Sequence, residues 1–134
     1  MRSSREEADE KALTPAVLGW ASVGTVAQII LVTAGHYLDV VFDAWPWPEL
    51  LVAGLAGSAY VIHIHRSYVD SAWHGGMVGG ICSFLGVALA VSLADFPPKE
   101  LATVTLAAIG TGAVFGLVVF GVIRPNVSHE SDLS

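Results

Sequence analysis

Three histidines are the residues whose type and spacing could do chemistry. His63, His65 and His74 fall within twelve positions of one another, and imidazole is a common ligand of metal ions and of haem. On a helix, however, His63 and His65 point about 160° apart and cannot both face His74. A tetrahedral zinc site needs four ligands, and the neighbouring segment adds only Asp70. Haem or metal binding at His63 and His74 therefore stays an alternative, and we expect no bound cofactor.

Side chains that could form a catalytic site are also few. The single cysteine, Cys82, lies inside an apolar run, and only Asp70 is close enough in sequence to orient a histidine. Nucleophilic catalysis needs a nucleophile, a base and a group that orients the base within reach of one another. We expect the chain not to be an enzyme.

The composition points to the solvent in which the chain folds. Hydrophobic residues make up 54% of the 134 positions and charged residues only 13%, whereas a soluble domain has about a quarter charged. The net charge of −6 comes with six scattered basic residues, so no basic patch for nucleic acid exists. The lipid bilayer is the expected partner.

Four apolar stretches could cross that bilayer, at about residues 15–37, 48–65, 72–94 and 99–123. A helix of 23 residues rises about 34 Å, which exceeds the roughly 30 Å of the hydrocarbon core. The second stretch is the shortest, because only residues 50–64 are free of charge. Thr14 with Pro15, and Asp70 with Ser71, are typical of helix starts. The sequence predicts an all-α polytopic membrane protein with four transmembrane helices in an up-down bundle with short loops.

The charged residues predict the orientation of this bundle. With four spans, one membrane side carries five basic residues and the other carries Lys99 alone, which places both termini in the cytoplasm. The chain then divides into a charged cytoplasmic tail (1–13), a transmembrane domain (14–124) and a short acidic cytoplasmic tail (125–134). The Asn126 sequon would face the cytoplasm and stay unmodified. We expect a multi-pass protein of a cell or viral membrane. The five basic residues are Arg2, Arg5, Lys11, Arg66 and Arg124.

Small residues recur at helical spacing within the spans. Because lipid tails are as apolar as leucine, close contact between small residues supplies much of the attraction between membrane helices. Such stripes predict helix packing within the chain or with another subunit, and we expect a homo-oligomer or a subunit of a membrane complex. The residues expected to pack helices are Gly54, Gly57, Gly76, Gly80, Gly112 and Gly116.

A polar side chain lies in the middle of the first span. Gln28 shares a helix face with Thr25, and an amide that faced lipid would be costly, so this face should point into the bundle or to a partner. A small channel or transporter using this face, with Ser83 or Thr105, is one alternative. Proton-coupled small multidrug exporters depend on a carboxylate within the first helix, whereas here every acidic residue lies outside the charge-free stretches of the spans, with Glu49 only at the edge of the second.

The run VDSAWHGGMVGGICSFLG at residues 69–86, with acidic tails and few lysines, resembles the small four-helix integral membrane proteins of halophilic archaea and of their membrane-enveloped viruses. The resemblance covers about residues 15–124, rests on composition and glycine placement, and implies no catalytic residues. The leading interpretation is therefore a structural or accessory integral membrane protein, which could also be a component of a virion membrane. It would associate through its small-residue helix faces with itself or with a larger complex.

Overall fold

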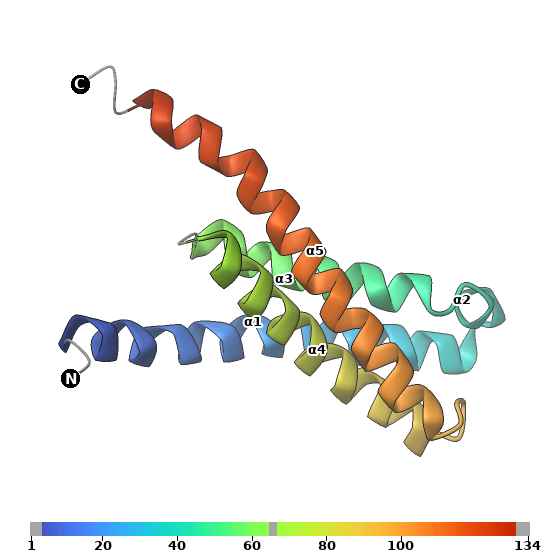
Figure 1. Cartoon of the computed structure of the whole chain (residues 1–134). Coiled ribbons are helices and arrows are strands. Elements are labelled where there is room, and N and C mark those ends of the chain that lie inside the picture. Colours follow the sequence, from blue (N-terminus) through green and yellow to red (C-terminus); the bar gives the residue numbers. More distant parts are fainter. Residues whose placement is uncertain (1–3, 65–66, 131–134) are drawn as a thin grey trace.

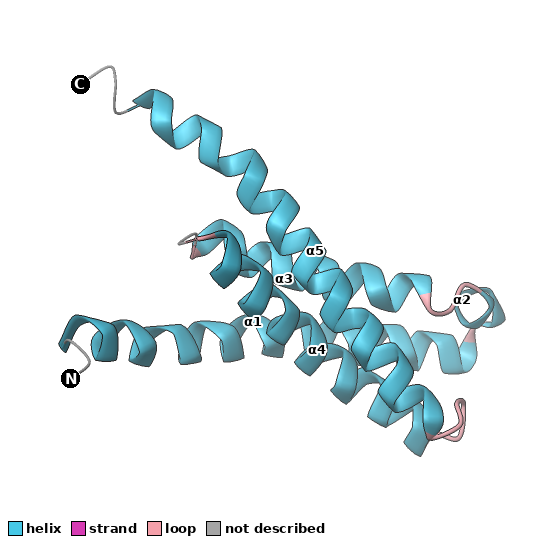
Figure 2. Cartoon of the chain, in the orientation of Figure 1, coloured by secondary structure: helices cyan, strands magenta, loops and turns pink. Residues whose placement is uncertain are grey.

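A computed structural model describes the backbone of residues 4–64 and 67–130, and the side chains of residues 15–64 and 67–123. The described chain is helical with short connections (Figure 1; Figure 2). Its helices are α1 (Ser4–Tyr37), α2 (Asp39–Asp43), α3 (Trp47–His63), α4 (Tyr68–Ser92) and α5 (Lys99–Glu130). The all-α prediction is confirmed for these residues.

Three helical segments are long and apolar enough to cross a membrane: Pro15–Tyr37 of α1, Tyr68–Ser92 (α4) and Lys99–Ile123 of α5. These segments indicate a membrane protein. α3 is not among them, and its 17 residues rise only about 26 Å. The length and hydropathy of α3 therefore do not by themselves show that it crosses the membrane.

Two predicted helix starts are wrong. α1 begins at Ser4, so Pro15 lies inside the helix and Thr14 is not its N-cap. α4 begins at Tyr68, and its N-cap is Ser67, whose Oγ accepts a hydrogen bond from the backbone N–H of Asp70 over 3.1 Å. Both errors arise because short capping patterns also occur inside helices and do not by themselves fix where a helix begins.

The other three long helices, α1, α3 and α5, pack around α4. α4 has its most extensive contact with α5 and also packs against α1 and α3, while α3 also contacts α5 and α1. The N-terminal ends of α1 and α4 and the C-terminal ends of α3 and α5 lie at the left of Figure 1, and α2 and the α4–α5 turn lie at the right. The right-hand end, which we call the α2 end, brings together the C-terminal ends of α1 and α4 and the N-terminal ends of α3 and α5.

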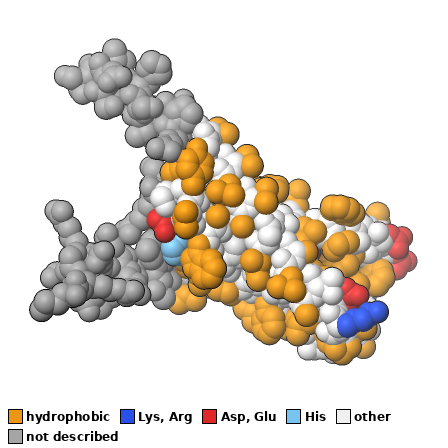
Figure 3. Space-filling view, viewed as in Figure 1, with side chains coloured by type: hydrophobic (Ala, Val, Ile, Leu, Met, Phe, Trp, Pro, Cys, Tyr) orange, Lys and Arg blue, Asp and Glu red, His pale blue; other side chains and the backbone are white. Residues whose placement is uncertain are grey.

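Large apolar side chains lie outside and small residues lie inside. Among the exposed side chains are Val23, Ile30, Leu55, Leu106 and Val122, and Figure 3 shows the hydrophobic cover over the visible face. The buried positions of α4, by contrast, are mostly glycine, serine, alanine and valine. Lipid, unlike water, does not drive large apolar groups inward, so this distribution is typical of packing by close backbone approach.

The closest approach involves α3, α4 and α5. A methyl group on Gly75 would lie 2.7 Å from the carbonyl oxygen of Gly112, and one on Gly57 would lie 2.8 Å from that of Gly75. At Gly116 the methyl would lie 2.5 Å from the carbonyl oxygen of Ser71. Only glycine lets these three backbones meet at this separation.

The last turn of α4 uses a left-handed residue. Ala94 has a φ of 64°, and the N–H of Asp95 bonds to the carbonyl of Ala90 over 3.1 Å, the pattern of a Schellman cap. Glycine is the usual residue at this position because a Cβ disfavours the conformation. The turn that follows carries Asp95 and Phe96 to the α2 end.

Candidate functional site

Three polar side chains from three helices meet in the interior. Gln28 of α1, Glu49 of α3 and Ser83 of α4 each have 0% exposed surface. The Gln28 Nε2 donates to the backbone carbonyl of Glu49 over 2.9 Å, and the Ser83 hydroxyl donates to the Glu49 Oε1. We call Gln28, Glu49 and Ser83 the polar cluster. Its bonds fasten α3 to both α1 and α4.

The sequence interpretation did not predict the burial of one cluster residue. Glu49 was expected at the edge of the second span and is the third residue of α3, and its side chain is fully buried. Gln28 and Ser83 each lie nine residues before the last residue of their helices, which corresponds to about 13 Å of helix. α3 therefore begins well below the ends of α1 and α4, which explains both its shortness and the depth of Glu49. The sequence feature that could have indicated a buried Glu49 is its position as a single carboxylate directly before the apolar run of residues 50–64.

The cluster is incompletely paired. The Glu49 Oε2 and the Gln28 Oε1 are buried and have no hydrogen-bond partner. Both atoms are acceptors, and an unpaired buried polar atom costs about 1–3 kcal/mol. The amide orientation of Gln28 is fixed because the Glu49 carbonyl can only accept, so Nε2 must face it. The cluster therefore lacks a donor or a cation rather than an acceptor.

Thr25 does not join the cluster. Its hydroxyl donates to the Ala21 carbonyl of its own helix over 2.8 Å, and Thr33 and Thr111 form the same type of bond. Thr105 differs, since its Oγ1 is buried without a partner. Hydroxyls that bond the carbonyl four residues earlier are satisfied within one helix, so Gln28 alone of the expected pair contributes a polar contact between helices.

The histidines do not converge. The Nδ1–H of His63 donates to the Ala59 carbonyl over 2.8 Å, and that of His74 to the Asp70 carbonyl over 2.9 Å. His63 also packs against Trp20, with ring centroids 4.9 Å apart. His65 lies outside the described residues. Within the described part of the chain, no group of three His, Cys, Asp or Glu side chains could hold a metal ion.

The expected packing glycines lie against neighbouring helices of the same chain. A methyl on Gly54 would meet the Phe115 ring at 2.9 Å, and methyls on Gly76 and Gly80 would meet Ile109 at 3.1 and 2.5 Å. Gly57, Gly112 and Gly116 lie at the backbone approach described above. These faces are thus occupied by contacts within one chain, so a partner would have to use another surface.

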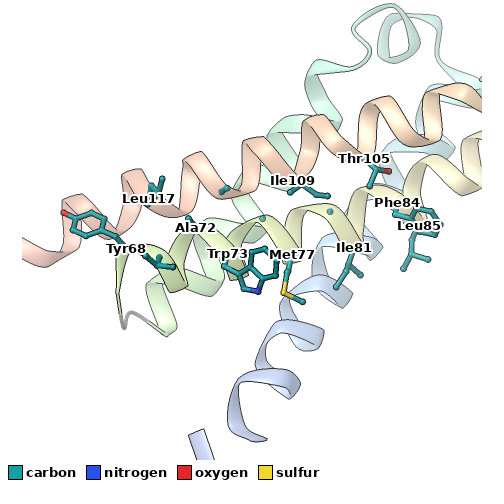
Figure 4. Close-up of a pocket in the computed structure, with 14 residues that line it drawn as sticks. Tyr68, Ala72, Trp73, Met77, Ile81, Phe84, Leu85, Thr105, Ile109 and Leu117 are labelled. Atoms are coloured by element: carbon teal, nitrogen blue, oxygen red, sulfur yellow. The ribbon is translucent and has the colours of Figure 1, made fainter. Parts of the chain in front are cut away.

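That other surface is an apolar groove on α4 and α5 with a volume of about 910 Å³, drawn in Figure 4. Along α4 it extends from Tyr68 to Leu85, which corresponds to about 26 Å of helix. Trp73 is 68% exposed and Met77 40%, and the unpartnered Thr105 also lines the groove. Neither this groove nor a small cavity of about 10 Å³ at the α2 end is lined by the polar cluster.

The α2 end is held by a hydrogen bond between His36 and Asp95 and by stacked rings. The Nδ1 of His36 lies 2.8 Å from the Asp95 Oδ1, joining α1 to the α4–α5 turn. Phe96 stacks on Phe42 and Trp45, with ring centroids 5.3 and 4.7 Å apart. These contacts hold α2 and the α4–α5 turn together at the C-terminal end of α1.

Comparison with known proteins adds no relative to this description. No protein family model matches the chain, no curated protein matches it, and no solved structure matches it. Its function must therefore be argued from its own residues.

Proposed function

We propose that this chain is an accessory integral membrane protein that associates with a second copy of itself through the groove on α4 and α5. In this proposal α1, α3, α4 and α5 cross the membrane as an up-down bundle and both termini are cytoplasmic. The groove is the observation that carries it. The resemblance to small membrane proteins of halophilic archaea and their viruses is compatible with such a role, including a place in a virion membrane.

The shape of the groove favours a helix as its occupant. The groove runs along α4 for a length close to the thickness of the hydrocarbon core, and its lining combines the half-buried small residues Ala72 and Ala113 with large exposed ones. Small residues let a second helix backbone approach, and large residues beside them give it side-chain contacts.

A second copy is the simplest source of such a helix. The exposed faces of the chain are themselves helical and apolar, and symmetric pairs are the commonest oligomers. In a two-fold pair, each groove residue near the axis faces its own counterpart. A single cysteine introduced there would therefore lie next to the same cysteine of the partner.

Disulfide crosslinking in lipid vesicles tests the proposal. We expect Met77→Cys, in a Cys82→Ala background, to form a crosslinked dimer on mild oxidation. Ile30→Cys is the control, because Ile30 is 64% exposed on α1 and does not line the groove. Equal crosslinking of both variants at low protein density would show random collision and reject the proposal.

A matched pair of tryptophan substitutions gives the energetic test. Trp73 and Trp47 are 68% and 75% exposed, so replacing either leaves the packing of the chain largely intact. We expect Trp73→Ala, in the groove, to weaken dimerisation by about tenfold or more, which is 1.4 kcal/mol per factor of ten. Trp47→Ala, outside the groove, should leave dimerisation unchanged when it is measured by native mass spectrometry in lipid.

A further inference from the structure

The unpaired oxygens of the polar cluster indicate a missing ligand. The Glu49 Oε2 and the Gln28 Oε1 belong to residues that are 0% exposed and directly hydrogen-bonded to each other. The Ser83 hydroxyl donates its hydrogen bond to the Glu49 Oε1, so the hydroxyl oxygen can still accept a hydrogen bond or bind a cation. Carboxylate, amide and hydroxyl oxygens from three helices thus lie in one buried cluster, and its two donors, the Gln28 Nε2 and the Ser83 hydroxyl, are used on other Glu49 oxygens, so the Glu49 Oε2 and the Gln28 Oε1 have no donor.

Among the described side chains, none of opposite charge pairs with Glu49. In the described ranges, 15–64 and 67–123, no Lys, Arg or His side chain forms an ion pair with Glu49, and the His36–Asp95 pair is satisfied separately. The titratable side chain on the facing stretch of α4 is Cys82, a buried thiol. A buried carboxylate without a counter-charge costs several kcal/mol. A bound positive ion would remove that cost.

The oxygen donors and the single charge define the class of ion. Oxygen ligands select hard cations over the soft metals that prefer sulfur or imidazole. One carboxylate balances a single positive charge, whereas a divalent ion would leave net charge in an apolar interior. A small monovalent cation therefore matches the charge of the site.

The surroundings of the α2 end also favour a cation. Its described acidic residues are Asp39, Asp43, Asp95 and Glu100, and Lys99 is the basic residue beside them. Figure 3 shows red acidic atoms and the blue basic side chain at this end. Clustered carboxylates raise the local concentration of cations.

We propose that Gln28, Glu49 and Ser83 bind one small monovalent cation, with Na⁺ as the probe. The Glu49 carboxylate balances the charge, the Gln28 carbonyl oxygen is a neutral ligand, and Ser83 holds the carboxylate in place. The site lies apart from the groove, so this inference does not depend on self-association.

Thermal unfolding in detergent micelles tests the proposal at fixed ionic strength, with Na⁺ exchanged for choline. At ten times the dissociation constant we expect Na⁺ to raise the Tm of the wild type by about 3 °C or more. Glu49→Gln keeps the size and the hydrogen-bond capacity of the side chain but removes its charge, and should abolish the Na⁺ effect. Asp43→Asn removes an exposed carboxylate of the same end and should retain most of it.

A direct measurement on the unmodified protein avoids dependence on the folding of a variant. Equilibrium dialysis with radioactive Na⁺ should find one ion per chain, displaced by unlabelled Na⁺ and not by choline. If the wild type binds no Na⁺, or if its Tm changes with pH but not with Na⁺, then a proton alone neutralises Glu49 and the proposal is wrong. Equal Na⁺ stabilisation of wild type and Glu49→Gln would also reject it.

Discussion

The contact between α4 and α5 makes a sharp prediction at two glycines of the same helix. A methyl group on Gly116 would lie 2.5 Å from the carbonyl oxygen of Ser71, whereas a methyl on Gly110 would have no neighbour within 4 Å. Carbon–oxygen contacts normally measure about 3.3–3.6 Å. Gly116→Ala therefore requires α4 and α5 to separate locally by about 0.8 Å or more, because a backbone carbonyl cannot rotate away as a side chain can.

The magnitude follows from two opposing terms. Inserting a methyl group into a tightly packed contact costs about 1–3 kcal/mol, and replacing glycine by alanine in a helix returns about 0.5–1 kcal/mol. We expect Gly116→Ala to lower the free energy of unfolding by about 1–2 kcal/mol. Gly110→Ala meets no obstacle and should leave stability unchanged or raise it by up to about 1 kcal/mol.

Equilibrium unfolding in mixed micelles, followed by circular dichroism and tryptophan fluorescence, would measure both variants. The opposite signs are the decisive feature, since both substitutions add one methyl group to α5. If Gly116→Ala proved as stable as Gly110→Ala, the backbones of α4 and α5 would not meet at Gly116 and the packing argument would fail.

The two ends of α4 give further predictions. Ser67→Ala removes the side chain that accepts from the Asp70 N–H and should cost about 1 kcal/mol; Ser92→Ala, which removes a hydroxyl bonded to its own helix, should cost less, and equal losses in chemical unfolding would contradict the capping role. Ala94→Gly relieves a left-handed alanine and should raise stability by about 1 kcal/mol, so a lower Tm for this variant would show that the Ala94 side chain makes a contact worth more than the strain.

Helical structure and the membrane character were predictable from the sequence because both depend on local properties. Long apolar runs such as residues 101–123 pair their backbone groups internally in a helix and match lipid on their outside, whatever their neighbours are. The glycine spacing likewise predicted where helices can approach closely. It could not predict that Gly76, Gly80 and Gly112 would be occupied by helices of the same chain, because a small-residue face does not specify its partner.

The polar cluster was decided by tertiary structure. Its members, Gln28, Glu49 and Ser83, are separated by 21 and 34 positions, and no periodicity relates them. Their meeting depends on where α3 begins relative to the depth of α1 and α4. A carboxylate next to an apolar run reads as a surface residue from sequence alone. Glu49 is buried because the first turn of α3 lies between α1 and α4, at the depth of Gln28 and Ser83. The fold therefore leaves a carboxylate in the interior, where its charge needs a counter-charge.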